Sequence, residues 1–317
     1  MGYMTRRTFV ELGAIAGGFA ALSGLAGCGS TSQASPASSA ASSFAESAES
    51  VESASSSSAS SSSASSSSAS SASASSEAPQ VYFARALDSA GLQAVFAVIG
   101  RELGSGKIGV KLSSGEPGGN HYLKGDLIAD LVHAVGGTIV ECNTAYGGGR
   151  SSIAAHYQVA ADHGFTAIAD FLIMDEAGSL SLPVVGGLHL SEDLVGAAFS
   201  DYDGFLILSH FKGHMMAGFG GALKNISIGM ASREGKYLIH SAGATSESWR
   251  SAATPDFLES MADPVALDQA CVDLVYASED DSADLIKRME SRDGVHVLEA
   301  AESLGVGSRA YELVEIG

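Results

Sequence analysis

The chain has little cysteine and little positive charge. Its 317 residues include only three cysteines, Cys28, Cys142 and Cys271, and no CxxC pair, so an iron–sulfur cluster held by the chain's own cysteines is not expected. From Pro79 onward there are 15 lysines and arginines against 31 acidic residues, a net charge of −16. So acidic a domain is not expected to bind nucleic acid or an anionic surface. Cys142 and Cys271 lie in apolar contexts, which favours buried free thiols over a disulfide.

A typical membrane-spanning run is also missing. The apolar segment near the N-terminus has about 16 residues, whereas a spanning helix needs roughly 20. Arg6 and Arg7 precede this segment, a pattern typical of a twin-arginine export signal, although a plain membrane anchor is the alternative. The signal ends in "LAGC", which resembles a lipoprotein processing box. Residues 1–28 are therefore predicted to be a twin-arginine lipoprotein signal. Cys28 would carry the lipid that anchors the exported protein to the cell membrane from outside the cytoplasm.

Residues 29–78 consist mostly of serine and alanine. Such a segment has almost no apolar area to bury, so we expect a disordered linker, with a glycosylated stalk as the alternative. Residues 79–317 are then the globular domain, and 239 residues are ample for one hydrophobic core. Twin-arginine export carries folded proteins, which suits a domain that acquires a metal or cofactor before it leaves the cytoplasm.

Short apolar runs alternate with helical patterns along this domain. The runs that read as strands are residues 81–84, 107–112, 138–142, 205–209 and 311–316. Helical spacing of apolar residues occurs at 91–103, 125–135, 152–164 and 263–277, the last with Asp263 as N-cap and Pro264 at the first helical position. Residues 180–193 read as a hairpin with Gly186–Gly187 at its turn. The alternation predicts one α/β domain with a mostly parallel sheet and helices on both faces.

Three glycine-rich polar loops follow predicted strands, and they are the main argument for a site. They are "SSGEPGGNHY" after 107–112, "NTAYGGGRSS" after 138–142 and "SHFKGHMMAGFGGALKN" at 209–225. Ligands of open parallel sheets bind beyond the carboxyl ends of the strands, so these loops are expected to converge there. The simpler interpretation is that the glycines only serve tight turns.

The candidate residues come from these loops and from the segment after them. Arg150 is a candidate for positioning a substrate carboxylate, with Glu116 and His121 at the same sheet edge. His210 and His214 are acid–base candidates, and structural hydrogen bonding is the alternative for each histidine. Gly220 and Gly221 precede Lys224 in a string that is neither a P-loop nor GxGxxG, so a phosphate site there is only weakly indicated. His133, His156, His163, His189 and His296 are assigned structural roles.

Several long motifs resemble one protein family. "KIGVKLSSGEPGG", "GTIVECNTAYGGGR", "DHGFTAI", "LSHFKGHMMAGFGGALKNISIGMAS" and "DPVALDQACVDLVY" are similar to the domain of unknown function 362 family, over residues 81–317. Many members carry ferredoxin-like cysteine motifs, but this chain has none, so the iron–sulfur label does not carry over. "ESMADPVALDQ" also lacks the Cys/Asp-rich segment that relatives have there.

A more distant resemblance concerns mechanism. "HMMAGFGGALK" is similar to a segment of the lactate racemase family, in which a lysine holds a nickel-pincer nucleotide and a later histidine binds nickel. The resemblance places Lys224 at the cofactor lysine, His240 at the nickel ligand and His214 at one acid–base histidine. The "YGGGR" loop has Gly149 where that family has its second acid–base histidine. Two-base racemisation is therefore not expected unless His121 or His210 takes that role.

These features lead to three alternative hypotheses about function. The first is an enzyme that holds a nickel-containing or other metal cofactor at Lys224, Gly220, Gly221 and His240, with His214 as a further metal ligand or as the acid–base group. Its substrate would be a small hydroxy acid or similar anion, in an isomerase- or oxidoreductase-like reaction. The second is a non-catalytic lipoprotein that captures a small anion or a metal for a membrane partner protein. The third is an accessory protein of a redox system, which the few cysteines disfavour.

Overall fold

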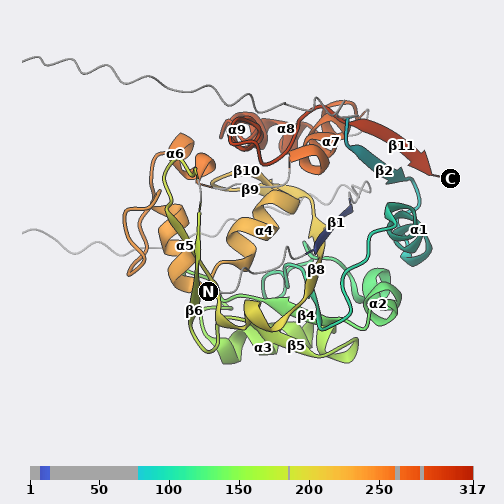
Figure 1. The fold of residues 1–317 in the computed structure, drawn as a ribbon, viewed down its shortest axis with the longest axis horizontal. Coiled ribbons are helices and arrows are strands. Elements are labelled where there is room, and N and C mark those ends of the chain that lie inside the picture. Colours follow the sequence, from blue (N-terminus) through green and yellow to red (C-terminus); the bar gives the residue numbers. More distant parts are fainter. Residues whose placement is uncertain (1–7, 15–77, 185, 261–264, 279–281, 317) are drawn as a thin grey trace, which may run out of the picture. The chain divides into compact units, whose positions relative to one another are not determined.

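The parallel sheet expected from the sequence forms the centre of the computed structural model, which describes residues 8–14, 78–184, 186–260, 265–278 and 282–316 (Figure 1). All of these residues belong to one compact unit. Five strands pair in parallel in the order β1, β8, β3, β4 and β5. Their bounds are β1 Thr8–Ala14, β3 Ile108–Lys111, β4 Thr138–Glu141, β5 Phe171–Ile173 and β8 Gly204–His210. The predicted α/β class is therefore confirmed.

Helices and a hairpin cover the two faces of this sheet. One face packs on α1 (Ser89–Ile99), α2 (Gly125–Ala134), α3 (Ile153–Asp162) and the 3-10 turn η1 (Phe165–Ala167). The other face packs on α4 (Ala222–Met230), on the hairpin of β6 (Ser179–Pro183) and β7 (Glu192–Gly196) and on the 3-10 turn η2 (Ala197–Asp201). Leu206 and Leu208 belong to the first cluster, and Phe205 and Ile207 belong to the second. Because alternate side chains of a strand point to opposite faces, a strand buried on both sides is a continuous apolar run.

A third apolar cluster lies beyond α4. It joins α5 (Arg233–His240), α6 (Thr254–Glu259), α7 (Val265–Tyr276), α8 (Ala283–Glu290) and α9 (His296–Ser303) to the hairpin of β9 (Lys212–His214) and β10 (Gly218–Gly220). Figure 1 shows α4 between this group and the sheet. In the described part of the chain, no helix combines the length and apolarity needed to cross a bilayer.

Two expectations need correction. The strands β2 (Gln80–Ala84) and β11 (Glu312–Ile316) do form, but they pair in parallel with each other, outside the main sheet. An apolar run does not specify its partner, and these two are far apart in the sequence. The hairpin β6 (Ser179–Pro183) and β7 (Glu192–Gly196) also forms, with Pro183 opposite Glu192. Its loop is therefore residues 184–191, and Gly186–Gly187 are not a two-residue turn.

Some predictions fall outside the described residues. These are Arg6, Arg7 and Cys28 of the predicted signal, the predicted linker up to residue 77, and the capping pair Asp263 and Pro264. Cys142 and Cys271 are described, and both are buried free thiols.

Candidate functional site

The candidate site lies at the point where the order of the sheet reverses. From β3 the chain proceeds outward to β4 and β5, whereas β8 adds on the other side of β3. Such a reversal opens a crevice beyond the carboxyl ends of the two central strands, where ligands of open α/β sheets bind. The three glycine-rich loops follow β3, β4 and β8, which are adjacent strands, so the fold brings all three to one edge.

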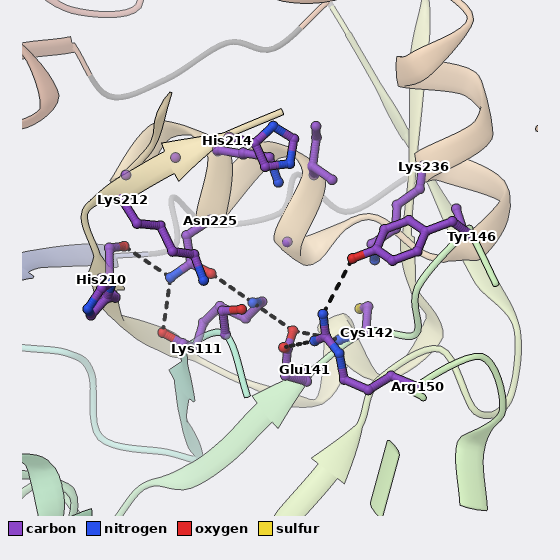
Figure 2. A pocket seen from close by; sticks show the side chains of 18 of the residues that line it. Lys111, Glu141, Cys142, Tyr146, Arg150, His210, Lys212, His214, Asn225 and Lys236 are labelled. Atoms are coloured by element: carbon purple, nitrogen blue, oxygen red, sulfur yellow. Dashed lines mark hydrogen bonds and ion pairs between the residues drawn. The ribbon is translucent and has the colours of Figure 1, made fainter. Parts of the chain in front are cut away.

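A pocket occupies this crevice and collects cationic side chains. Among the described residues that line it are Lys111, Arg150, Lys212, Lys224 and Lys236, and the only carboxylate among them is Glu141. Figure 2 shows Lys111, Glu141 and Arg150 along one wall, with His214 on the opposite side. In a domain that is acidic as a whole, this local excess of positive charge favours an anionic ligand.

Lys224 has the fewest polar partners of these cations among the described residues. It lies on the first turn of α4, is partly buried, and its Nζ makes no hydrogen bond or ion pair with any described residue. Burial, together with the charges of Lys212 and Lys236, lowers the pKa of Lys224 to about 7. Much of the amine is therefore uncharged and nucleophilic near neutral pH, and a bound anion would favour its charged form.

His240 has its ring fixed for ligand binding. Its Nδ1 lies 2.7 Å from the carbonyl oxygen of Lys236, one helical turn earlier in α5. A carbonyl only accepts, so Nδ1 carries the proton and Nε2 keeps its lone pair. The ring packs against Trp249 and Phe257, with centroids 4.6 and 4.8 Å away. Burial lowers the pKa of His240 to about 4, so the ring is neutral at pH 7. This is the arrangement found in metal-ligating histidines.

His214 has the opposite tautomer. Its Nδ1 accepts from the backbone N–H groups of Met216 and Ala217, at 3.3 and 3.1 Å. The neutral ring therefore carries its proton on Nε2 and presents a donor. Burial and the neighbouring Lys224 lower the pKa of His214 to about 2, so this neutral form persists at pH 7. This geometry suits hydrogen-bond donation to a substrate oxygen better than metal ligation.

His210 also lines the pocket, at the end of β8. Its Nδ1 is buried without a hydrogen-bond partner among the described residues. Burial is the main reason that the pKa of His210 is lowered to about 4. His210 is therefore a neutral imidazole with one nitrogen available.

The N-terminus of α4 is already occupied by a carboxylate. Asp268 of α7 accepts from the backbone N–H groups of Ala222 and Leu223, at 2.7 and 2.8 Å. A Cβ on Gly221 would lie 2.2 Å from Asp268 Oδ1, so only glycine leaves room for this cap. Gly220 and Gly221 line the pocket. The backbone N–H groups of Ala222 and Leu223, which follow them, already donate to Asp268 and are not free to bind a phosphate.

Arg150 is held in a buried charge network. Its Nη2 contacts Glu116 Oε1 at 2.5 Å, and its Nη1 lies 3.5 Å from Glu141 Oε1. Glu141 also pairs with Lys111 Nζ at 3.0 Å, and Asn225 Oδ1 accepts from the same amine at 2.8 Å. Both terminal nitrogens of Arg150 are thus engaged, and its Nε is buried without a partner among the described residues. Clamping a carboxylate through two nitrogens would require Arg150 to release one of these contacts.

The remaining candidates lie at the margin. Glu116 contacts Arg150 but does not line the pocket, and His121 is exposed, with its carbonyl oxygen accepting from Lys212 Nζ at 3.0 Å. The sequence analysis missed Lys111, Glu141 and Lys236 as pocket residues. Lys111 and Glu141 had a usable signal, because each is a charged residue at the end of a short strand whose neighbouring residues are buried and apolar.

The comparisons with known proteins identify a family. A model described as "Domain of unknown function (DUF362)" matches residues 108–263, a shorter span than the 81–317 over which the motifs resemble that family. The matched span includes β3, β4 and β8 together with Lys224 and His240. No curated protein and no solved structure matches the chain. The chain therefore belongs to the family of the domain of unknown function DUF362.

Proposed function

We propose that the pocket binds a metal-bearing cofactor together with a small anion, and that the protein is an exported enzyme acting on a hydroxy acid or a similar substrate. One observation carries this proposal: Lys224, His214 and His240, which come from a β-strand and two helices, line the same cationic pocket. The pocket thus combines three different groups: the unpaired amine of Lys224, the Nε2 lone pair of His240 and the Nε2–H donor of His214.

The residues fit a cofactor of the nickel-pincer type. Lys224 offers an amine without a protein partner, which suits a covalent or ionic bond to a cofactor carbonyl or acid group. His240 offers Nε2, with Nδ1 already donated to a backbone carbonyl. When bound, such a group would supply an electron-pair acceptor for the reaction at the substrate's carbinol carbon.

The chain's own side chains then act on the substrate. Lys212, whose amine donates to a backbone carbonyl and has no carboxylate partner among the described residues, is the pocket cation best placed to hold the substrate's negative charge. His214 Nε2–H is placed to donate a hydrogen bond to a substrate oxygen and so to stabilise negative charge that develops there. Because Gly149 occupies the position of the second acid–base histidine, His210 with its unpartnered Nδ1 is the best substitute. Arg150 orients Glu141 and Glu116 and contributes positive charge at the far wall.

Metal content is the first test. Mature protein exported by its native host should contain close to one equivalent of nickel or another transition metal in this pocket. The peptide carrying Lys224 should show a mass addition. We expect His240→Ala to abolish at least about nine tenths of the metal held in this pocket, measured as the loss of close to one equivalent relative to the wild type, whereas His133→Ala, which changes an exposed histidine, should cause no loss. Protein that never carries metal or added mass, yet binds small anions, would instead be a non-catalytic anion-binding lipoprotein.

We also propose that the protein acts outside the cytoplasm, anchored by lipid on Cys28, where a membrane partner protein can meet it. Processing before Cys28 would remove the edge strand β1, so that β8 would be the edge strand of the mature sheet. Arg6, Arg7 and the "LAGC" box support this proposal. Cys28→Ser should release the protein from the membrane fraction, and Arg6→Lys with Arg7→Lys should retain it in the cytoplasm. Matched Ser30→Ala should change neither. A wild-type protein that fractionates with the cytoplasm would refute this localisation.

A further inference from the structure

Three of the residues set aside as structural or unnoticed in the sequence meet at one place. His189 Nε2 lies 2.8 Å from Glu259 Oε2, and His296 Nε2 lies 3.0 Å from Glu259 Oε1. One carboxylate thus bridges two imidazoles. All three side chains are about a quarter exposed, at 25%, 25% and 27%, so the cluster is accessible from solvent but partly shielded.

A fourth donor lies beside them. Asp256 precedes Glu259 by one helical turn on α6, and ligand atoms of His189, Asp256 and Glu259 all lie within 4.8 Å of one another. The donors come from three segments: the loop between β6 and β7, α6, and the first residue of α9. None of the four residues lines the pocket described above.

We propose that His189, His296, Glu259 and Asp256 form a second site, which binds a divalent transition metal such as zinc. Two imidazole nitrogens and two carboxylates are a donor set that Zn²⁺ accepts in tetrahedral geometry. Ligand atoms of His189, Asp256 and Glu259 lie within 4.8 Å of one another, and His296 Nε2 lies 3.0 Å from Glu259, so all four side chains can close around one ion by side-chain movement.

The protons of the site can be accounted for. Each imidazole now donates its Nε2–H to Glu259, since a carboxylate only accepts. On metal binding, each Nε2 binds the ion with its lone pair and the ring proton moves to Nδ1. For His296 an acceptor is already near, because Glu299 Oε2 lies 3.6 Å from His296 Nδ1. A carboxylate on the second nitrogen is the usual companion of a metal-bound histidine.

Metal at this site would add a further link between three segments that already pack together in the third apolar cluster. The α6 helix also carries Phe257, which stacks on His240 of the pocket. Fixing α6 would therefore support the ring on which the proposed function depends, although the second site stands on its own observations.

The test is a Co²⁺ and Zn²⁺ titration of untagged full-length protein in the His240→Ala background, which removes the ligand of the first site. We expect one equivalent to bind, with the visible absorption of four-coordinate Co²⁺, and to be displaced by Zn²⁺. His189→Ala and Glu259→Gln should each weaken binding at least about tenfold, whereas His133→Ala should not. Circular dichroism of the metal-free variants verifies folding. Absence of binding, or binding that His189→Ala and Glu259→Gln leave unchanged, would overturn the proposal.

Discussion

Replacing Lys224 with methionine should stabilise the protein by roughly 2–4 kcal/mol at pH 7, while abolishing retention of any cofactor held by that amine. The pKa of Lys224 is lowered to about 7, mainly by burial and then by neighbouring cations. The unfolded chain holds this proton up to a pH of about 10.4. Folding at pH 7 must therefore either release the proton or keep a charge in an unfavourable place. Methionine, which has a similar length and no charge, avoids both.

The lowered pKa of Lys224 also predicts how the free energy of unfolding changes with pH. Between pH 7 and about 10.4 the unfolded state binds a proton that the folded state does not, so the stability of the wild type should rise with pH. The advantage of Lys224→Met should be largest at or below pH 7 and should disappear above about pH 10. Urea unfolding of both proteins from pH 6 to 10 measures this difference.

Lys287→Met is the matched control, because Lys287 is exposed on α8. The same substitution there should change stability by less than about 0.5 kcal/mol. A destabilised Lys224→Met variant would mean that the amine has a compensating partner in the folded protein, and would count against a lysine kept for function. A gain in stability at the expense of function is the usual result at binding sites.

The sheet and the position of the site were predictable because they depend on local pattern and on one topological rule. The runs 107–112, 138–142 and 205–209 match β3, β4 and β8 to within two residues. Since parallel strands end at a common edge, the loops that follow adjacent strands had to meet there. Lys224 and His240 came from a resemblance, and the pocket does contain both.

Other features could not be predicted from the sequence, because they depend on contacts between residues that are far apart in it. The pairing of β2 with β11 and the meeting of His189 with Glu259 and His296 arise from tertiary packing that periodicity does not encode. The hairpin of β9 and β10 was missed because glycine-rich strands of three residues give no alternation signal. Lys111 and Glu141 were not recognised as pocket residues, because the apolar residues beside them were enough to predict each strand and drew no attention to the charge at its end.

Glu141→Gln should destabilise the protein by about 3–5 kcal/mol, the range found when one partner of a buried ion pair is removed. Glu141 is buried and contacts Lys111 Nζ at 3.0 Å, Arg150 Nη1 at 3.5 Å and the backbone N–H of Ser114 at 2.9 Å. Glutamine keeps the shape and an acceptor oxygen, but it leaves the buried Lys111 without a counter-charge and Arg150 with Glu116 alone. Unfolding in urea at pH 7 measures the loss, and Glu102→Gln, at an exposed glutamate, is the matched control.

A second substitution and a pH series separate the lost charge from other effects. Burial alone would raise the pKa of Glu141, but the charges of Lys111, His156 and Arg150 outweigh it and hold the pKa well below its usual range. The stabilisation is thus complete above a pH of about 4.5 and is lost as the pH falls below it. In Glu141→Gln this acid-dependent loss should shrink. Because Lys111→Met removes one unpaired cation, the double variant should lose at least about 1 kcal/mol less than the sum of the single losses. Strictly additive losses would mean that Lys111 and Glu141 stabilise the fold independently. The attraction between their charges would then not hold the pocket wall that they form.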